Sequence, residues 1–248
     1  MTIDTAFEEE RREGIRAIAE DGAFAAISGA WLSRAQEQRY SYHFDWLGLP
    51  IIQYPQDIVA MQEIIWSVKP DLIIETGIAR GGSVIFYASM LELLASCGHG
   101  EGSVVAVDID IRTANRQAIA GHPMSRRIEM IEGSSIAPEV ITQIQAKAQS
   151  RRRVLVCLDS NHTHDHVLAE LHAYAGLASV GSYVVVFDTL VEDISETAIG
   201  DRPWGKGNNP KTAVHAFLAQ DDRFEIDQSI HQKLQVTVAP DGFLKRVR

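Results

Sequence analysis

The strand–turn–helix segment at residues 71–83, DLIIETGIARGGS, is the feature that most constrains the fold of this chain. An apolar strand at Leu72–Ile74 runs into Glu75 and a glycine-rich turn, and the apolar segment Val84–Leu94 follows as an expected buried helix. Glycine at such a turn lets the backbone approach a ligand closely, where a Cβ would collide. We therefore expect a nucleotide-like ligand at this turn.

The glycines of the turn, Gly77, Gly81 and Gly82, have the spacing G-x-x-x-G-G rather than the G-x-G-x-x-G of dinucleotide-binding proteins. Glu75 also precedes the turn at a point where its carboxylate would repel a pyrophosphate. The cationic ammonium and sulfonium groups of S-adenosylmethionine would tolerate that carboxylate better. The turn therefore favours S-adenosylmethionine as the ligand.

Short apolar segments alternate with helical ones from residue 71 onward, which predicts a mostly parallel sheet with helices on both faces. The expected strands are Leu72–Thr76, Ser103–Asp108, Ile128–Ile131, Val154–Asp159, Tyr183–Phe187, Phe224–Ile226 and Leu234–Ala239. The expected helices cover residues 82–97, 112–120, 136–149, 163–175 and 209–220. Because only residues 227–233 separate the last two strands, we expect these strands to form an antiparallel hairpin. Seven strands with this ending predict an α/β, Rossmann-like class I methyltransferase fold.

Residues 1–57 are expected to form a helical arm and an aromatic loop, which precede an S-adenosylmethionine-binding domain at residues 58–248. The pattern of residues 1–40 predicts one or two amphipathic helices. The aromatic residues of segment 40–57 either attach the arm to the core or line an acceptor pocket. Asp57 is expected to cap a helix that ends near Val68.

The formal net charge of −10 argues against a nucleic-acid partner. No stretch approaches the roughly 20 apolar residues of a membrane span, and the acidic N-terminal segment lacks the apolar core of a signal peptide. We therefore expect a cytoplasmic protein with no membrane partner. Cys97 and Cys157 lie in apolar stretches and do not suggest a disulfide framework.

Ligands bind beyond the carboxyl ends of the strands in an open parallel sheet, so the residues that follow each strand are the candidate site residues. Asp108 ends the second strand and could accept hydrogen bonds from both hydroxyls of a ribose, and Ile109 and Asp110 follow it. NAD enzymes use the same arrangement, so Asp108 alone supports any adenosine cofactor. Ser134 and Ser135 follow the third strand and either flank an adenine or cap a helix.

Two carboxylates are expected to meet at the ends of the fourth and fifth strands. Asp159 and Asp188 end adjacent parallel strands, roughly 5 Å apart, so the pair would repel unless a cation or proton lay between them. Oxygen ligands at this spacing suit Mg²⁺; the alternative is one solvated aspartate and one helix cap. His162, three residues beyond Asp159, is then placed to act as a general base near neutral pH.

The segment HTHDH at residues 162–166 has a second interpretation as a zinc site. It is one residue shorter than the H-x-H-x-D-H motif of metallo-β-lactamase-like hydrolases. His162 and His166 also have the i, i+4 spacing of two zinc ligands on one helix face. The α/β alternation contradicts the β-sandwich of those hydrolases, so zinc-dependent hydrolysis is the less favoured reading.

The polar loop at residues 190–210 follows Asp188 directly and is rich in Gly, Pro and Asn. It could lie over the acceptor of the reaction. Its candidates for gripping a polyhydroxylated acceptor are Trp204, Asn208, Asn209 and Lys211. Ordered turns and an asparagine helix cap are the alternative roles for these residues.

Taken together, the motifs ETGIARGGS, VDIDIR, GSS, LDSNHTHDHV, GSYVVVFDT and RPWGKGNNPKTAV resemble the cephalosporin hydroxylase (CmcI-like) and rhamnosyl O-methyltransferase family over nearly all of residues 40–248. The resemblance implies a class I S-adenosylmethionine fold, often oligomeric, with Mg²⁺ held by acidic residues near the methyl donor. Related macrolide sugar O-methyltransferases use an Asp-x-x-His element that Asp159 and His162 match. That match implies that the aspartate binds the metal and the histidine is the base.

The chain departs from this family at the end of the fifth strand. Many relatives have Glu-Asp there, whereas this chain has Phe187 and Asp188. One carboxylate ligand is therefore missing, so we expect either weaker metal binding or a substitute ligand in Thr189. We find no facial triad of two histidines and one carboxylate that would hold oxygen-activating iron, so hydroxylation is not expected.

The sequence thus predicts a Mg²⁺-dependent, S-adenosylmethionine-dependent O-methyltransferase, expected as a homo-oligomer, that acts on a hydroxyl of a sugar or small natural product. His162 is the expected catalytic base, and Asp159, Asp188 and Thr189 are the expected metal ligands. The expected cofactor-binding residues are Glu75, Thr76, Gly77, Gly81, Gly82, Ser83, Asp108, Ile109, Asp110, Ser134, Ser135 and Asp159. The alternatives are a nucleotide-binding protein associated with a hydroxylase or oxidoreductase, and a non-catalytic assembly subunit.

Overall fold

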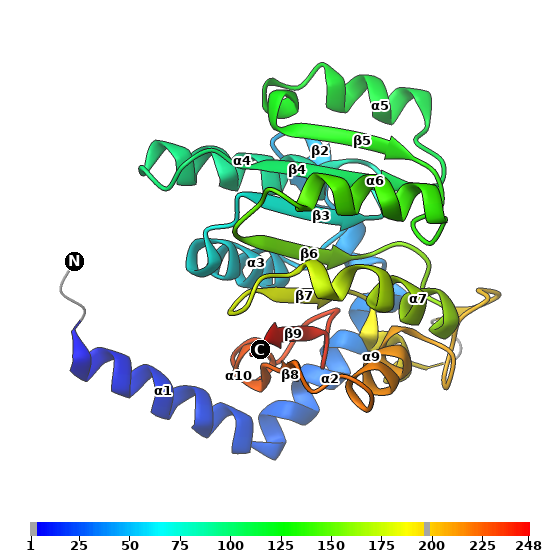
Figure 1. The fold of residues 1–248 in the computed structure, drawn as a ribbon. Helices are drawn as coiled ribbons and strands as arrows, with labels where there is room; N and C mark the ends of the chain where they lie inside the picture. Colours follow the sequence, from blue (N-terminus) through cyan, green and yellow to red (C-terminus); the bar gives the residue numbers. More distant parts are fainter. Residues whose placement is uncertain (1–3, 196–198) are drawn as a thin grey trace.

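Within residues 4–195 and 199–248, which the computed structural model describes, seven strands form one sheet with helices on both faces (Figure 1). The strands of this sheet are β3 (Leu72–Thr76), β4 (Ser103–Asp108), β5 (Ile128–Glu132), β6 (Val154–Leu158), β7 (Tyr183–Val186), β8 (Phe224–Ile226) and β9 (Phe243–Arg246). Two short strands, β1 (Asp45–Trp46) and β2 (Leu49–Pro50), pair with each other outside the sheet.

The described helices connect and cover these strands. The α-helices are α1 (Thr5–Glu20), α2 (Gly22–Glu37), α3 (Pro55–Val68), α4 (Gly82–Ser96), α5 (Thr113–Ala120), α6 (Pro138–Ala148), α7 (His164–Tyr174), α9 (Pro210–Leu218) and α10 (Gln228–Leu234). The 3₁₀ helices are η1 (Tyr40–His43), η2 (Pro123–Arg127), η3 (Ala175–Leu177) and η4 (Thr189–Glu192). All five of the helices expected after residue 71, and six of the seven expected strands, are found within two residues of their expected ends.

The order of the strands determines where a ligand can bind. The order is β5–β4–β3–β6–β7–β9–β8, in which β9 runs antiparallel to both of its neighbours and the other pairs are parallel. Successive strands are added on one side of β3 and then on the other, so the switch point lies between β3 and β6. Open α/β sheets bind ligands at the carboxyl ends of strands beside such a point. The expected fold, a mostly parallel sheet with an antiparallel last strand, is confirmed.

The central strands β3, β6 and β7 are buried on both faces, which explains why they are mostly apolar, whereas the edge strands β5 and β8 expose glutamates. Successive side chains of a strand point to opposite faces. In β3, Ile73 packs into the apolar cluster under α3, α4 and α10, whereas Leu72 and Ile74 pack into the cluster under α6, α7 and α9. The sheet is therefore held rigidly between two apolar layers, and its strand ends form a fixed edge.

The expected strand at Leu234–Ala239 is wrong, because this segment ends α10 and then continues as a buried connection to β9. The side chain of Asp57 in α3 provides hydrogen-bond acceptors that a neighbouring strand would otherwise provide. Its carboxylate accepts hydrogen bonds from the backbone N–H of Val238, at 3.0 Å, and from the hydroxyl of Thr237. β8 and β9 still pair antiparallel, but residues 227–242 separate them, so they are not the short hairpin that we expected.

Asp57 does not cap α3, as the sequence had predicted. Tyr54 occupies the N-cap position, and the Asp57 side chain is fully buried in the first turn of the helix. Burial, opposed by the hydrogen bonds from Thr237 and Val238, raises the pKa of Asp57 to about 7. The predicted boundary between residues 57 and 58 falls inside α3, and the division into two units stays a prediction.

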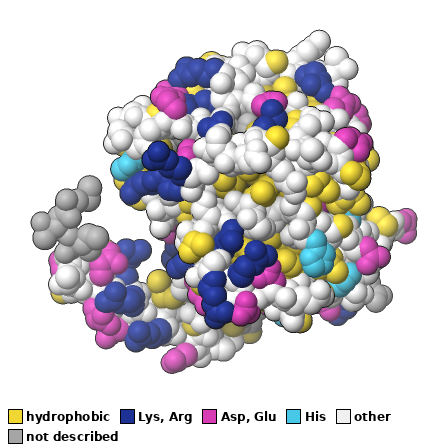
Figure 2. All heavy atoms as spheres, viewed as in Figure 1, with side chains coloured by type: hydrophobic (Ala, Val, Ile, Leu, Met, Phe, Trp, Pro, Cys, Tyr) yellow, Lys and Arg dark blue, Asp and Glu magenta, His cyan; other side chains and the backbone are white. Residues whose placement is uncertain are grey.

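The N-terminal helices α1 and α2 confirm the expectation of helices within residues 1–40. α1 extends away from the sheet and lies against α10, and none of its residues is buried (Figure 1). Charges of both signs are interspersed along it (Figure 2). Arg11 pairs with Glu8, and Arg12 pairs with Glu9. Among residues 4–195 and 199–248, no helix combines the length and apolar character that crossing a membrane requires.

The aromatic segment that follows α2 attaches the arm to the core. The rings of Tyr40 and Trp31 lie 5.1 Å apart edge to face, and those of Tyr40 and Phe44 make a similar contact. The ring of Tyr40 also packs in a tilted arrangement on the fully buried Tyr54. Edge-to-face pairs of this kind add to the stabilisation from burial. Tyr42 instead lines a cavity at the strand ends, and the role of this segment in an acceptor pocket stays a prediction.

Candidate active site

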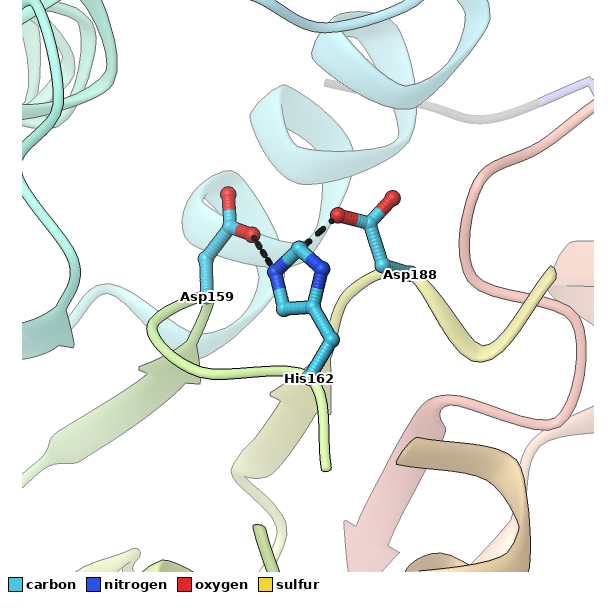
Figure 3. A group of neighbouring side chains, drawn as sticks. All are labelled: Asp159, His162 and Asp188. Carbon is cyan, nitrogen blue, oxygen red and sulfur yellow. Dashed lines mark ion pairs between the residues drawn. The ribbon is translucent and has the colours of Figure 1, made fainter. Parts of the chain in front are cut away.

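The two carboxylates and the imidazole that were expected to carry the chemistry come together beyond β6 and β7 (Figure 3). Nε2 of His162 lies 3.2 Å from Oδ2 of Asp188 and 3.5 Å from Oδ1 of Asp159. One ligand atom from each residue lies within 4.8 Å of the other two. The imidazole therefore lies between the carboxylates, close enough to exchange a proton with a group bound beside them.

Backbone pairing fixes the positions of the two aspartates. The N–H of Asp159 donates to the carbonyl of Thr76 at 2.9 Å, which extends the pairing of β3 and β6 beyond the strand ends. The N–H of Phe187 donates in the same way to the carbonyl of Leu158, at 3.0 Å. Asp188 then adopts a left-handed conformation with φ of 55°, a region that aspartate tolerates better than most residues. Its carboxylate is thereby turned toward His162.

The glycines of the first turn make room for other parts of the chain. A Cβ at Gly77, which has φ of 93°, would lie 1.9 Å from the carbonyl oxygen of Asp159. A Cβ at Gly82 would lie 2.2 Å from the carbonyl oxygen of Pro50, and one at Gly81 would collide with the Ile119 side chain. At Gly77 and Gly82, the atoms that approach the glycine closely thus belong to the protein's own backbone, whereas the sequence had predicted a ligand there.

The electrostatics of the three residues are coupled. Burial lowers the pKa of His162, but the Asp188 and Asp159 carboxylates outweigh this effect and raise it to about 8. Burial raises the pKa of Asp159 to about 6, with a further contribution from Asp188, although His162 opposes the shift. Two partly buried carboxylates this close favour a bound cation or proton. The group is therefore suited to bind a divalent cation or to hold a proton.

A first cavity, of about 340 Å³, opens on the side of the N-terminal segment. Asp159, His162 and Asp188 border it. Its other walls come from the glycine-rich turn after β3, the arm, the segment before α3 and the loop after β7, and they include Gln36, Tyr42, Gln53, Leu190, Ile194 and Trp204. This mixture of apolar walls and a few polar groups is typical of small-molecule sites.

A second cavity, of about 410 Å³, lies over the carboxyl ends of β3, β4 and β5. It is lined by the residues expected to bind the adenosine, Asp108, Ile109, Ser134 and Ser135. Gly77, Asp159 and Trp204 line both cavities. The two cavities therefore meet beside His162, which is the arrangement that a transfer between two bound molecules requires.

Asp108 also holds the glycine turn in place. One carboxylate oxygen accepts hydrogen bonds from the backbone N–H groups of Ile78, at 2.8 Å, and Ala79, at 3.1 Å. The other accepts from the N–H of Asp110, at 3.1 Å. A carboxylate has about four lone-pair positions, so Asp108 retains acceptor capacity for a ligand in the second cavity.

Glu75 lines neither cavity and lies buried behind the residues that do. Its side chain is buried, and the Ser83 hydroxyl that hydrogen-bonds it lines the first cavity. Burial raises the pKa of Glu75 well above its usual range, with Ser83 opposing the shift. Of the other expected cofactor and metal residues, those that line neither cavity are Thr76, Gly81, Asp110 and Thr189.

The proposed substitution of Thr189 for a missing carboxylate ligand is contradicted by the structure. Thr189 is fully buried, and its hydroxyl donates a hydrogen bond to the carbonyl of Pro240 at 2.6 Å. The left-handed turn at Asp188 directs the following residue into the core, away from the cavity. Phe187 is likewise buried, so neither neighbour of Asp188 presents an oxygen to the site.

Four residues of the loop at 190–210 were expected to bind the acceptor, and one of them lines the cavities. Trp204 lines both cavities, and its ring centroid lies 4.8 Å from that of His162. Asn208 accepts from the N–H of His164, and Asn209 caps α9. Lys211 pairs with Asp193 and Asp241. Residues 196–198 of this loop lie outside the described residues.

The zinc interpretation of the histidine-rich segment finds no support in the placement of its side chains. Nδ1 of His164 lies 2.8 Å from the Thr212 hydroxyl. Nε2 of His166 lies 3.0 Å from the hydroxyl of Ser135 and 3.2 Å from that of Ser160, at the floor of the second cavity. The described residues thus place His166 in a hydrogen-bond network rather than beside His162 on a shared ion.

Gln53 is a further candidate site residue, which the sequence did not predict. It lines the first cavity, and its Nε2 donates to Oδ2 of Asp159 at 3.3 Å. It lies in the aromatic segment between β2 and α3, before the strands of the seven-stranded sheet begin, and no motif marks it. The aromatic residues on either side of it were the signal that this segment reaches the site.

Comparisons with known proteins agree with this geometry. A rhamnosyl O-methyltransferase of Mycobacterium leprae is 30% identical over 206 residues, which cover 81% of this chain and 82% of that protein. A structure of CmcI with Mg and S-adenosylmethionine aligns with a TM-score of 0.54 and 16% identity over 84% of this chain and 78% of that one. The methyltransferase MycE, solved with Mg, S-adenosylhomocysteine and mycinamycin VI, aligns with a TM-score of 0.52 and 15% identity over 88% of this chain and 53% of that one. These two structures share the fold of this chain. The rhamnosyl O-methyltransferase/CmcI family model matches residues 38–247, and the chain belongs to this family.

Proposed function

We propose that this S-adenosylmethionine-dependent O-methyltransferase transfers the methyl group to a hydroxyl of a sugar, or of a natural product that carries one, with Mg²⁺ bound at Asp159 and Asp188. The observation that carries the proposal is the junction of the two cavities at Asp159, beside the imidazole of His162. The relatives that are named rhamnosyl O-methyltransferases support a sugar as the acceptor.

The second cavity fits the adenosine part of S-adenosylmethionine. Asp108 is the acceptor suited to ribose hydroxyls, and Ser134 and Ser135 are small polar residues suited to the edge of an adenine. The methionine end would extend past Gly77 toward Ser83 and the junction of the cavities. Burial raises the pKa of Glu75, which hydrogen-bonds Ser83, and a cationic group bound at that end would favour the ionised form of its carboxyl group.

The carboxylates fit a divalent cation that prefers oxygen ligands. Asp159 and Asp188 present oxygens across a gap that a single ion can bridge, and Mg²⁺ is bound in proteins mainly by one or two carboxylates with water and substrate oxygens. Imidazole is a weaker choice for this ion. We therefore assign the metal to the two aspartates and leave His162 free for proton transfer.

In this assignment the chain's own residues bind, orient and deprotonate the acceptor. When bound, S-adenosylmethionine supplies an electrophilic methyl group, and Mg²⁺ lowers the pKa of a hydroxyl that it contacts. His162 accepts the hydroxyl proton at Nε2, and the adjacent Asp188 and Asp159 stabilise the imidazolium that results. Trp204 covers the imidazole and limits the access of water. Holding both reactants in line accounts for much of the rate enhancement in such a transfer.

The N-terminal segment belongs to the acceptor side in this proposal. Gln36 of α2, Tyr42 of η1 and Gln53 line the first cavity, whereas the second cavity is built from residues after the start of β3. We infer that the arm and the aromatic segment determine the specificity for the acceptor. The expected homo-oligomer stays a prediction.

Replacing Asp108 with alanine is expected to weaken S-adenosylhomocysteine binding about 10–100-fold, because a carboxylate that accepts hydrogen bonds from the ligand is lost. The measurement is isothermal titration calorimetry, supported by thermal denaturation with the ligand. At a hundred times its Kd, S-adenosylhomocysteine should stabilise the wild type by about 2.7 kcal/mol. NAD should not stabilise it.

Asp110→Ala is the matched control, since the Asp110 side chain is exposed and lines neither cavity. This variant should bind S-adenosylhomocysteine as the wild type does. If Asp108→Ala bound S-adenosylhomocysteine with the same affinity as the wild type, the assignment of the donor to the second cavity would be contradicted.

A further inference from the structure

Gln53 has an unpartnered oxygen in the cavity where the chemistry is proposed to occur. The residue is 7% exposed. Its Nε2 donates to Oδ2 of Asp159 at 3.3 Å, but within residues 4–195 and 199–248 no group donates to its buried Oε1. A buried amide oxygen without a partner is costly, and such groups in native proteins call for an explanation, such as an ion.

The backbone around Gln53 holds the amide in this position. Ile52 has φ of 49°, a left-handed conformation that a β-branched residue rarely adopts. On the other side, the chain at Pro50 and Ile51 packs directly onto Gly82, where a Cβ would lie 2.2 Å from the Pro50 carbonyl oxygen. The segment is thus fixed against the start of α4, and the Gln53 side chain is directed toward Asp159.

The geometry matches that of a third oxygen ligand. Mg²⁺ binds six ligands octahedrally at about 2.0–2.1 Å, which places neighbouring ligand atoms about 3 Å apart. The Gln53 amide lies 3.3 Å from Oδ2 of Asp159, and Phe187, next to Asp188, presents only a buried ring. The oxygen and nitrogen of a glutamine amide exchange places by a half-turn. The carboxylate alone attracts the NH₂ group, whereas a cation beside the carboxylate attracts the oxygen.

We propose that the amide oxygen of Gln53 is a third protein ligand of the divalent cation, together with Asp159 and Asp188. This inference rests on the proposed metal site and adds a neutral ligand from the N-terminal segment. It also connects the acceptor side to the metal, because the segment that carries Gln53 borders the first cavity beside Tyr42.

The test is isothermal titration calorimetry with MgCl₂ on the full chain. Gln53→Met, which keeps the length of the side chain but removes its oxygen, should weaken Mg²⁺ binding about 10–100-fold. Gln53→Glu, which restores an oxygen and adds a charge, should bind Mg²⁺ at least as tightly as the wild type. Gln56→Met is the matched control, since its Oε1 is also buried and unpartnered among the described residues but lines neither cavity.

The outcomes separate this inference from the proposed function. Retained stabilisation by S-adenosylhomocysteine in Gln53→Met would show that the variant is folded. If the variant then bound Mg²⁺ as tightly as the wild type, Gln53 would not be a ligand; a raised KM for the acceptor with unchanged Mg²⁺ affinity would make it an acceptor contact instead. If the wild type itself bound no Mg²⁺, both the proposed metal dependence and this inference would fail.

Discussion

Replacing His162 with alanine is expected to lower kcat about 10²–10⁴-fold, the range typical of removing a general base. Nε2 of His162 is the nitrogen that lies between Asp159 and Asp188, where the acceptor hydroxyl would be bound. S-adenosylhomocysteine affinity should be unchanged, because His162 does not line the second cavity. Initial rates of S-adenosylhomocysteine formation with a methyl acceptor, measured together with calorimetry of S-adenosylhomocysteine binding, test both parts.

Two controls distinguish a base from a residue that merely supports the fold. Added imidazole should restore part of the activity of His162→Ala, since the free base can occupy the space that the substitution opens. His215→Ala should retain full activity, because the exposed His215 side chain pairs with Asp241 away from both cavities. Full activity in His162→Ala would contradict the assignment of His162 as the general base.

The Gly77→Ala substitution is expected to destabilise the protein by about 2–5 kcal/mol, the sum of left-handed strain and a steric collision. The new Cβ would lie 1.9 Å from the carbonyl oxygen of Asp159, so either β3 or the end of β6 must move. A displacement of about 1 Å at a catalytic group can reduce the rate about 100-fold. Urea denaturation gives the loss of stability, and kcat/KM gives the effect on catalysis.

Gly98→Ala separates the two causes. Gly98 has φ of 82°, close to that of Gly77, but no atom lies within 4 Å of the position of its Cβ. This control should lose only the strain, about 1–2 kcal/mol, and should keep its activity. If Gly77→Ala behaved like Gly98→Ala in both measurements, the tight packing of Gly77 on Asp159 would have no role in the site.

The strand ends were predictable from the sequence because the physics that places them is local. A strand that is buried on both faces is mostly apolar, so the polar residues at its end or just after it mark its carboxyl end. Asp108, Asp159 and Asp188 were located in this way, and the parallel order of β6 and β7 was enough to predict that Asp159 and Asp188 would meet.

Residues whose partners are distant in the chain were not predictable in the same way. The segment at Leu234–Ala239 has the alternation of a strand, but the carboxylate of Asp57, 181 residues before Val238, takes the hydrogen bond that a strand would have made. Gln53 reaches Asp159 across 106 residues, from a segment that only its aromatic residues distinguished. Thr189 was assigned by position alone, and the left-handed turn at Asp188 directs it into the core.

Methyl transfer to a sugar hydroxyl at the metal site can be measured with deuterated S-adenosylmethionine and methyl α-L-rhamnoside, by mass spectrometry of the product formed with Mg²⁺ or with EDTA. We expect a deuteromethylated sugar with Mg²⁺, little or no product with EDTA, and little or no product from Asp188→Asn. If Asp188→Asn formed product at the wild-type rate, or if EDTA had no effect on the wild type, the metal-bound acceptor site at Asp159 and Asp188 would be contradicted. If the wild type bound S-adenosylhomocysteine but methylated no sugar hydroxyl in a panel of glycosides, the proposed acceptor class would be contradicted.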